Sequence, residues 1–290
     1  MRCACIDIGS NTTRLLVADR EGGALRAVHE ERAFTRLGAS VAGGAAIPAA
    51  KQAEVIAVVA GQLESARAWG AERIRGVATA AIRRAGDGVA FVRTVHAETG
   101  LQVSILSDRE EARLAFVGAA GTFEGPCPEP LGVLDVGGGS SEVVVGRAPG
   151  TIAWWASLPL GSGTLATRYF ASDPPTASAL AAARAEVRSA VRRLAPPRPA
   201  AAVAVGGSAT SLSRLAGPSL DAASLAEALA VLASEPSVAV AQRFAIEPER
   251  ARLLGAGLLI LEGVGRALGG PISVGRGGIR EGVLLEASGR

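Results

Sequence analysis

A short pattern that occurs twice constrains the fold of this chain more than any other feature. Residues 5–17 read CIDIGSNTTRLLV and residues 133–145 read VLDVGGGSSEVVV, so Asp7 corresponds to Asp135 and Gly9 to Gly137 at an offset of 128 residues. Each copy is an apolar strand ending in an aspartate, a turn of small residues and a second apolar strand, which predicts a β-hairpin. Backbone N–H groups at such a tip can hold an anion. The repeat therefore predicts a duplicated domain with a phosphate held between the halves.

The composition predicts a globular protein. The 290 residues are 49% apolar and 20% charged, enough for two domains with sizeable cores. No apolar run approaches the roughly 20 residues of a membrane-spanning helix. No signal-peptide core precedes the first strand, so we expect a cytoplasmic protein. The net charge is only +3 and aromatic residues are 3%, which argues against nucleic-acid binding.

Neither the cysteines nor the histidines are spaced for a metal site. We expect Cys3 and Cys5 on one face of a strand and Cys127 in a loop. This odd, sparse set without a CxxC pair predicts reduced thiols. His29 and His96 are far apart and lack a nearby acidic pair, so we expect both at the surface and no histidine-based metal site.

Strands and helices alternate through both halves of the chain, which predicts an α/β fold. The Gly/Pro-rich stretch 121–130 is the best candidate for a domain boundary. We therefore predict an N-terminal domain over residues 1–122 and a C-terminal domain over residues 123–290. Because each half begins with strand–turn–strand, the pattern resembles the two RNase H-like domains of the actin/hexokinase superfamily, with an interdomain cleft.

The periodicity of apolar residues predicts the individual elements. In the first half, we expect strands at 24–34, 73–79 and 101–106 and helices at 48–69, 88–99 and 107–120. In the second half, we expect strands near 151–158, 200–205 and 271–274 and helices from about 163 and at 176–194, 208–216, 221–234 and about 248–268, with a closing helix after residues 275–278.

Three small-residue loops are candidates for binding phosphate. The single lysine, Lys51, falls in a predicted helix, so a P-loop is excluded, and no GxSxG nucleophile elbow is present. Glycine lets the backbone approach an anion closely, and the third loop also follows a strand and opens a helix. The candidate phosphate-binding residues are Gly9, Ser10, Asn11, Gly137, Gly138, Gly139, Ser140, Ser141, Gly206, Gly207 and Ser208. Asp7 and Asp135 could hold Mg²⁺ directly or through water.

Two adjacent carboxylates near residue 110 are predicted to differ in role. Ser107 and Glu110 form an S-x-x-E capping box, which predicts that Glu110 caps a helix. Glu111 instead shares a helix face with Leu114 and Gly118, and that face is the packed one. An inward carboxylate is costly unless it has a partner or a function, so Glu111 is a candidate functional residue.

Seven motifs together resemble the exopolyphosphatase / guanosine pentaphosphate phosphohydrolase (Ppx/GppA) family, in a short two-domain form. They run in order from residue 5 to about residue 285, which is nearly the whole chain. The motifs are Asp7-Ile-Gly-Ser-Asn-Thr with Arg14-Leu, Thr79-Ala-Ala-Ile-Arg83, Glu110-Glu111-Ala-Arg113-Leu, Asp135-Val-Gly-Gly-Gly-Ser-Ser-Glu142, Leu158-Pro-Leu-Gly161, Gly206-Gly207-Ser208 and Gly278-Ile-Arg-Glu-Gly282.

The resemblance implies a role for each matching residue. Glu111 matches the catalytic base that activates water, and Arg83 matches an arginine that contacts the phosphoryl groups. Asp135 and Glu142 match acidic residues near the divalent metal and the scissile phosphate. The implied set is Glu111, Arg83 and Glu142 for catalysis, with Asp7, Asp135 and Glu142 for Mg²⁺ or Mn²⁺. Three departures are Asp108, which stands where glycine is common, Ser162-Gly163-Thr164, which replaces an apolar stretch, and Gly275-Arg276-Gly277-Gly278, which is more glycine-rich than expected.

The resemblance implies an exopolyphosphatase that removes terminal phosphate from inorganic polyphosphate. The helical, His/Asp-rich C-terminal region of longer members has no counterpart here, so we expect short polyphosphate chains as substrate. Hydrolysis of guanosine pentaphosphate (pppGpp) is the alternative enzyme activity, and a non-catalytic polyphosphate or nucleotide sensor is the alternative of another class. The implied partners are polyphosphate or pppGpp, without nucleic acid or membrane, and a homodimer is one assembly left open. Candidate arginines for a polyphosphate chain are Arg14, Arg36, Arg83, Arg113 and Arg168.

Overall fold

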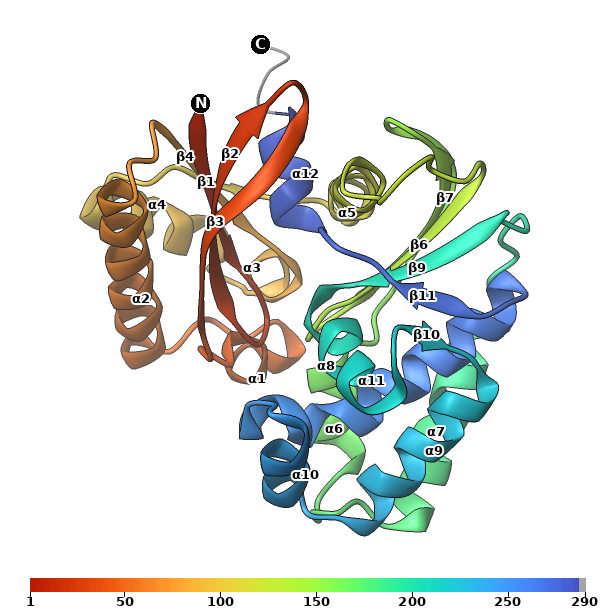
Figure 1. Cartoon of the computed structure of the whole chain (residues 1–290). Helices are drawn as coiled ribbons and strands as arrows, with labels where there is room; N and C mark the ends of the chain where they lie inside the picture. The colour runs from red at the N-terminus through yellow and green to blue at the C-terminus, as the bar shows by residue number, and fades with distance from the viewer. Residues whose placement is uncertain (287–290) are drawn as a thin grey trace. The chain divides into compact units, whose positions relative to one another are not determined.

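Two β-sheets organise residues 1–286, which are the residues that this computed structural model describes (Figure 1). The chain divides into two compact units. Unit 1 comprises residues 1–122 with the segment from residue 277 onward, and unit 2 comprises residues 123–276. Each unit contains one sheet with helices packed on it, which confirms the predicted α/β class.

The sheet of unit 1 is built from β1 (Arg2–Ile8), β2 (Thr13–Glu21), β3 (Ala24–Ala33), β4 (Arg73–Ala78) and β5 (Val103–Ile105). Its helices are α1 (Leu37–Ser40), α2 (Ala49–Ala68), α3 (Ala80–Arg84), α4 (Gly88–Thr99), α5 (Asp108–Gly121) and α12 (Ile279–Glu286). A 3₁₀ turn spans Ala42–Gly44.

Strand β1 is buried on both faces, and its side chains alternate between two cores. Ala4 and Ile6 pack in the cluster that contains the apolar side chains of α2 and α4. Cys3 and Cys5 lie on the other face, with Leu114 of α5 and residues of α12, as their predicted shared face requires. Asp7 continues the odd-numbered series, so it lies on the α5 and α12 face of the sheet.

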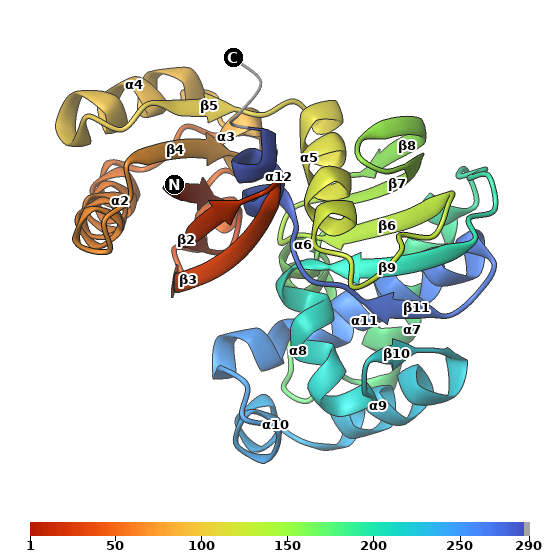
Figure 2. The same cartoon turned by 45° about the horizontal axis from the view of Figure 1, so that its top comes forward.

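The sheet of unit 2 is built from β6 (Leu131–Val136), β7 (Ser141–Arg147), β8 (Thr151–Leu158), β9 (Ala201–Val205), β10 (Ser219–Leu220) and β11 (Ile272–Val274). Its helices are α6 (Ser162–Tyr169), α7 (Ala177–Val191), α8 (Gly206–Ala216), α9 (Ala222–Ser234), α10 (Ser237–Phe244) and α11 (Pro248–Leu268). Helices α7, α9 and α11 lie on one side of the sheet (Figure 2). Leu134 and Val143 face these helices in one continuous core, whereas Asp135 alternates to the other face.

Five strands have the same order in both sheets. The order is β3-β2-β1-β4-β5 in unit 1 and β8-β7-β6-β9-β11 in unit 2, where β10 is added beyond β11. In each of these orders the first three strands form antiparallel pairs. The last two strands run parallel to the central strand, which is β1 in unit 1 and β6 in unit 2. The repeated motifs thus form β1–β2 and β6–β7 at equivalent places, which confirms the duplicated RNase H-like architecture.

Helix α12 corrects the predicted domain boundary. The sequence assigns residues 123–290 to one domain, but α12 belongs to unit 1 and packs on α5 and β1 (Figure 1). A Cβ on Gly118 would lie 2.0 Å from the carbonyl oxygen of Gly278, and one on Gly282 would lie 2.1 Å from that of Leu114. The helices therefore touch backbone to backbone. Apolar periodicity identifies the buried face of a helix but not the element that covers it.

The remaining differences concern short elements. Helices α1, α3 and α10 and strand β10 were not predicted, since periodicity is unreliable over so few residues. Helix α8 begins at Gly206, two residues before its predicted start. Among the described helices, none combines the length and the apolar composition that crossing a membrane requires.

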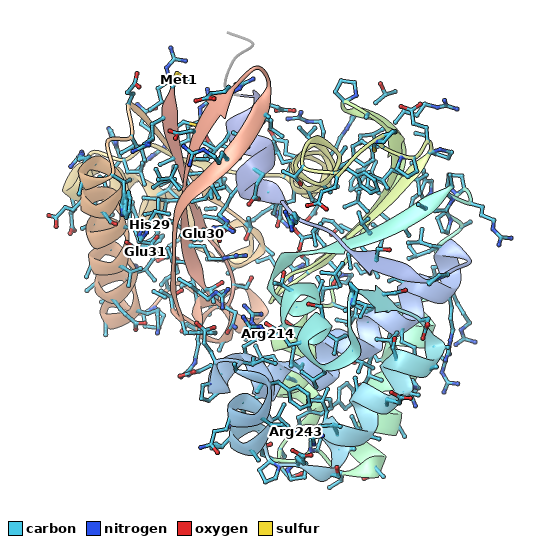
Figure 3. All side chains as sticks on the ribbon, in the orientation of Figure 1. Met1, His29, Glu30, Glu31, Arg214 and Arg243 are labelled. Atoms are coloured by element: carbon cyan, nitrogen blue, oxygen red, sulfur yellow. The ribbon has the colours of Figure 1, made fainter. Side chains whose placement is uncertain are left out.

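His29 contacts one acidic residue, Glu31, which the sequence analysis does not predict. Its Nε2 lies 2.8 Å from Oε1 of Glu31, and both residues are labelled in Figure 3. Its ring stacks on that of Trp69 with the centroids 4.8 Å apart. Glu31 also accepts a hydrogen bond from Ser65 of α2. Residues 29 and 31 share a face of β3 because side chains alternate along a strand. This group joins β3 to the end of α2.

Candidate active site

The first hairpin tip is held by backbone hydrogen bonds. The N–H of Gly9 donates to the carbonyl oxygen of Thr12 at 3.0 Å. The carbonyl oxygens of Ser10 and Asn11 accept from the N–H groups of Gly38 and Arg36 at 2.7 and 3.0 Å. The side-chain nitrogen of Asn11 is buried and has no hydrogen-bond partner within residues 1–286. Buried donors are normally satisfied, so this atom suits an anionic ligand.

Asp7 lies directly opposite Arg14 in the pairing of β1 and β2. The Oδ1 atom of Asp7 is buried without a hydrogen-bond partner among the described residues. Burial raises the pKa of Asp7 to about 6, although the charge of Arg14 opposes the rise. Burial also lowers the pKa of Arg14 to about 10, and repulsion from Arg280 and Arg32 adds to that effect. The first tip therefore carries its own counter-charge.

The second hairpin tip is held by helix α6. The N–H groups of Ser162 and Gly163 donate to the carbonyl oxygens of Gly137 and Gly138 at 2.9 and 3.0 Å. A Cβ on Gly161 would lie 2.4 Å from the backbone of Gly138, so α6 approaches the tip as closely as glycine allows. The departure at residues 162–164 thus has a local structural role, because a bulkier side chain at position 163 would meet the tip backbone at 2.9 Å.

The predicted serines of this tip are buried. Ser140 is nearly inaccessible, and the hydroxyl of Ser141 donates to the carbonyl oxygen of Leu160 at 2.6 Å. A hydroxyl has one proton to donate, so that of Ser141 is already used. Any contact of Ser141 with phosphate would therefore come from its backbone N–H, as expected for this tip, and its assignment as a phosphate-binding residue stays a prediction.

Asp135 and Glu142 form the counterpart of Asp7 and Arg14. They lie directly opposite each other in the pairing of β6 and β7. Each follows its counterpart in the first hairpin by 128 residues, but Glu142 is acidic where Arg14 is basic. Both are buried, and the hydroxyl of Ser157 donates to Oε1 of Glu142 at 3.0 Å. Opposed like charges on neighbouring strands destabilise a sheet.

The donor set of Asp135 and Glu142 fits a hard divalent cation. Mg²⁺ and Mn²⁺ prefer carboxylate oxygen, and a cation would relieve the repulsion between these two groups. The first tip fits a cation less well, because Arg14 already stands beside Asp7. The residues of unit 2 thus suit the metal that the sequence analysis expects, and the chemistry of this pair carries that conclusion.

The third loop lies between an acid and a base. A Cβ on Gly206, whose φ is +84°, would lie 2.5 Å from Oδ1 of Asp135, so only glycine lets the carboxylate approach this backbone. A Cβ on Gly207 would lie 2.6 Å from a guanidinium nitrogen of Arg250. Ser208 is buried against Gly257 of α11. The N-cap residue of α8 is Val205, whose side chain forms no capping hydrogen bond.

Arg250 is a candidate that the sequence analysis missed. It is buried, and it belongs to the first turn of α11, which begins with Pro248. The available signal was its position four residues before Leu254 and seven before Gly257, on the packed face of the helix. An inward arginine is costly without compensation, which is the argument that identified Glu111.

Arg83 and Glu111 are in direct contact in unit 1. Arg83 Nη1 donates to Glu111 Oε2 and to the carbonyl oxygen of Leu106, the latter at 2.7 Å. Arg83 Nη2 donates to Oδ1 of Asp108. Glu111 is 3% exposed, as the helix face predicts. One guanidinium therefore joins the end of α3 to two carboxylates on the first turn of α5.

Glu110 has the predicted capping role. Ser107 Oγ accepts from the N–H of Glu110 at 3.2 Å, and Glu110 Oε2 accepts from the N–H of Ser107 at 2.9 Å. The hydrogen bonds that the N–H and the hydroxyl of Ser107 donate to the Glu110 carboxylate lower the pKa of Glu110. The capping box is thus confirmed, and the adjacent glutamates have different environments.

Two of the arginines proposed for a polyphosphate chain are engaged elsewhere. Arg113 forms a bidentate ion pair with Glu286 of α12, with one contact at 2.9 Å. Arg168 forms an ion pair with Glu186 of α7. Both arginines therefore have carboxylate partners within their own units, and their assignment to a polyphosphate chain stays a prediction. Sequence alone cannot show this, because their partners are 173 and 18 residues away.

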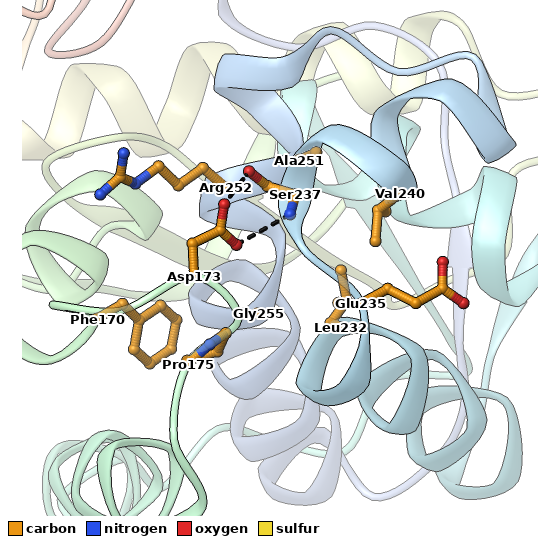
Figure 4. Close-up of a pocket in the computed structure, with 10 residues that line it drawn as sticks. All are labelled: Phe170, Asp173, Pro175, Leu232, Glu235, Ser237, Val240, Ala251, Arg252 and Gly255. Atoms are coloured by element: carbon orange, nitrogen blue, oxygen red, sulfur yellow. Dashed lines mark hydrogen bonds between the residues drawn. The ribbon is translucent and has the colours of Figure 1, made fainter.

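A small pocket in unit 2 contains none of the candidate residues. It is lined by Phe170, Asp173, Leu232, Ser237 and residues of α11 (Figure 4). Asp173 accepts hydrogen bonds from the N–H and the hydroxyl of Ser237 at 2.9 and 2.5 Å. The carboxylate therefore caps α10, and the pocket is assigned no ligand.

Comparison with known proteins places the chain in a family. Residues 16–290 match the Ppx/GppA phosphatase family. An uncharacterized protein of Streptomyces coelicolor is 38% identical over 225 residues, which are 75% of this chain and 66% of that protein. Exopolyphosphatase 2 of Mycobacterium tuberculosis is 32% identical over 292 residues, covering 92% of this chain and 91% of that protein.

The solved structures agree with the sequence matches. The crystal structure of the Ppx/GppA family member of Aquifex aeolicus is 28% identical, with a TM-score of 0.82, and the match covers 98% of this chain and 96% of that one. An exopolyphosphatase structure from Cytophaga hutchinsonii has a TM-score of 0.85 at 19% identity and supports the fold. The family supports a phosphate-hydrolysing function and, with the acidic pair of unit 2, a divalent metal. The chain belongs to the Ppx/GppA phosphatase family.

Proposed function

We propose that this protein is an exopolyphosphatase that removes terminal phosphate from short inorganic polyphosphate chains. The observation that carries the proposal is the contact between buried Glu111 and Arg83. This contact brings together, within unit 1, a carboxylate that can take a proton from water and a guanidinium that can bind phosphate. A relative named exopolyphosphatase 2 is 32% identical over 92% of this chain, which supports the same activity.

Glu111 acts as the general base in the proposed reaction. A water oxygen attacks the terminal phosphorus, the bond to the bridging oxygen breaks, and the water proton passes to the Glu111 carboxylate. The shortened chain leaves with the bridging oxygen. Arg83 stabilises negative charge on the transferring phosphoryl group, which is the main requirement in this kind of transfer.

Asp135 and Glu142 would hold the divalent cation. When bound, Mg²⁺ or Mn²⁺ neutralises phosphate charge and orients the group that is transferred. Ser157 fixes one oxygen of Glu142, so that carboxylate has a defined orientation. Asp7, which lies opposite Arg14, would be the candidate cation ligand of unit 1.

The glycine loops supply the phosphate cradle. The backbone N–H groups near Gly9, Gly138 and Gly207 can approach phosphate because no side chain intervenes. The Asn11 amide adds a donor at the first tip, and the start of α8, where the N-cap residue Val205 has no polar side chain, adds N–H groups at the third loop. These groups recognise charge and shape, so they suit a substrate that repeats one chemical unit.

The test is phosphate release from polyphosphates of several lengths, compared with pppGpp and ATP. We expect the highest kcat/KM for a short polyphosphate at physiological salt. The KM for polyphosphate should rise with salt as screening weakens the contacts with charged groups. A higher kcat/KM for pppGpp would replace polyphosphate with the nucleotide as substrate. Binding without any release of phosphate would replace the enzyme with a sensor.

A further inference from the structure

Asp108 contacts the same guanidinium as Glu111. It is the first residue of α5, and its side chain is 47% exposed, whereas those of Arg83 and Glu111 are 18% and 4% exposed. Its Oδ1 accepts from Nη2 of Arg83. Asp108 is therefore the accessible member of a three-residue group whose other members are enclosed.

The donors of Arg83 show what this contact does. A guanidinium has five N–H groups, of which Nη1 carries two and Nη2 carries two. Both N–H groups of Nη1 are used, one for Glu111 and one for the carbonyl oxygen of Leu106. Any bidentate contact with a phosphate must therefore include Nη2. That is the nitrogen to which Asp108 is bonded.

We propose that Asp108 competes with phosphate for Arg83 and thereby weakens substrate binding. The inference rests on the proposed function in one respect, namely that the ligand of Arg83 is a phosphate chain. Asp108 places a carboxylate on one of the two N–H groups of Nη2, and its negative charge opposes the approach of a polyanion. The ion pair is partly exposed through Asp108, and a pair of this kind contributes little free energy, so the substrate can displace it. Asp108 is thus a positioning residue that acts through Arg83.

The charge at Asp108 could alternatively serve only the fold, because acidic residues stabilise the first turn of a helix. The two roles have different signatures. A purely structural role changes the stability of the protein and leaves the KM for phosphate chains unaltered. Competition changes KM, and the change depends on Arg83.

The experiment uses Asp108→Asn, which removes the charge and keeps the shape, and Asp108→Ser, which removes the contact. We expect the KM for tripolyphosphate to fall by roughly 2- to 5-fold in Asp108→Asn, as for the loss of a partly exposed ion pair, and at least as far in Asp108→Ser. The turnover number should change much less. Glu110→Gln is the matched control, because it removes the same charge two residues away and leaves KM unaltered.

Binding of tripolyphosphate, measured by calorimetry, separates this inference from the proposed function. If the wild type binds but releases no phosphate, the enzyme proposal fails while the binding constants still decide the role of Asp108. The effect of Asp108→Asn should disappear when Arg83 is replaced by Gln. An unchanged or weaker affinity in Asp108→Asn, an equal gain in the Arg83→Gln background, or no tripolyphosphate binding by any variant would overturn the inference.

Discussion

Glu142 stands where its structural counterpart, Arg14, stands in the first hairpin. The strand pairing is equivalent, and the offset is the same 128 residues that relate the two motifs. The substitution of an acid for a base changes the electrostatics of one copy. The hairpin of unit 1 contains a carboxylate and a guanidinium, whereas that of unit 2 contains two carboxylates. Duplication thus gave one backbone geometry and two charge patterns.

The first prediction is that Mg²⁺ or Mn²⁺ stabilises the protein through Asp135 and Glu142. At about 100 times its dissociation constant, a cation bound only to the folded state adds about 2.7 kcal/mol. Thermal unfolding followed with and without the cation measures this effect. Glu142→Gln should lose most of the stabilisation, while Glu129→Gln, an exposed substitution in the same unit, should retain it. Equal stabilisation of both variants would show that the metal does not bind at Glu142.

The second prediction separates the adjacent glutamates. Glu111→Gln should lower the turnover number by at least about 10²-fold, because the amide cannot accept the proton from water. The fold should change little, since the two side chains have nearly the same shape. Glu110→Gln should have a far smaller effect, because glutamine also completes a capping box. Steady-state kinetics on a short polyphosphate measures both, and equal losses would refute the assignment.

The third prediction concerns the geometry of Arg83. Lysine keeps the positive charge but has a single ammonium nitrogen. It cannot replace the planar guanidinium, which bonds to Glu111 and Asp108 through two separate nitrogens and would also bond to phosphate. We expect Arg83→Lys to lose roughly 10- to 100-fold in kcat/KM, from about 1.5–3 kcal/mol per lost charge-assisted hydrogen bond. Far-ultraviolet circular dichroism should show an intact fold. Full activity in this variant would assign Arg83 a structural role only.

The fourth prediction is a pH dependence that arises from Asp7. Its pKa of about 6 in the folded protein lies above the ordinary value of 3.8, so folding favours the protonated form. The free energy of unfolding therefore falls as the pH rises through 6 and Asp7 ionises in the folded protein. Asp7→Asn has no ionisable group at this position and does not show this loss. Relative to the wild type, the variant should gain at most about 3 kcal/mol between pH 4 and pH 8, at about 1.4 kcal/mol per pKa unit.

Denaturant unfolding at several pH values tests this sign. Asp19→Asn is an opposite control, because a hydrogen bond from Arg2 lowers the pKa of Asp19, and the benefit of its charge is lost as the pH falls. A stability difference between Asp7→Asn and the wild type that does not vary with pH would show that Asp7 keeps an ordinary pKa.

The fifth prediction concerns the contact between α5 and α12. Gly118→Ala should destabilise unit 1 by about 1–3 kcal/mol or more, because the new methyl group meets the backbone of Gly278. Gly61→Ala is the matched control, since it lies in the exposed face of α2 with nothing within 4 Å. Alanine there should stabilise by about 0.5–1 kcal/mol. Similar effects of the two substitutions would contradict the close helix packing.

The sequence predicts what depends on local patterns. The two hairpins follow from alternating apolar residues around small-residue turns, and the role of Glu110 follows from Ser107 three residues earlier. The location of α12 could not be predicted, because Val283 and Leu284 show that one face is buried but not what covers it. The contact of Asp108 with Arg83 spans 25 residues and depends on tertiary structure.

The charge difference between the two hairpins is already visible in the amino-acid sequence. Arg14 and Glu142 occupy the same position in the two motifs, so the change from a base to an acid can be read from the residues themselves. Matching glycines and aspartates identify the repeat, whereas the positions that differ between the copies carry its functional asymmetry. A comparison of these differing positions favours the second copy as the cation site without any knowledge of the strand pairing.

The return of α12 to unit 1 determines the order in which the protein can be completed during synthesis. Translation produces all of unit 2 before it produces Val283 and Leu284, which cover Cys5, Leu16 and Leu114. Until then only α5 covers the face of the first sheet that contains Cys5 and Leu16. Unit 2 can be synthesised completely before unit 1 acquires α12. A chain interrupted before α12 therefore has an incomplete unit 1 with exposed apolar side chains, which makes it prone to aggregation.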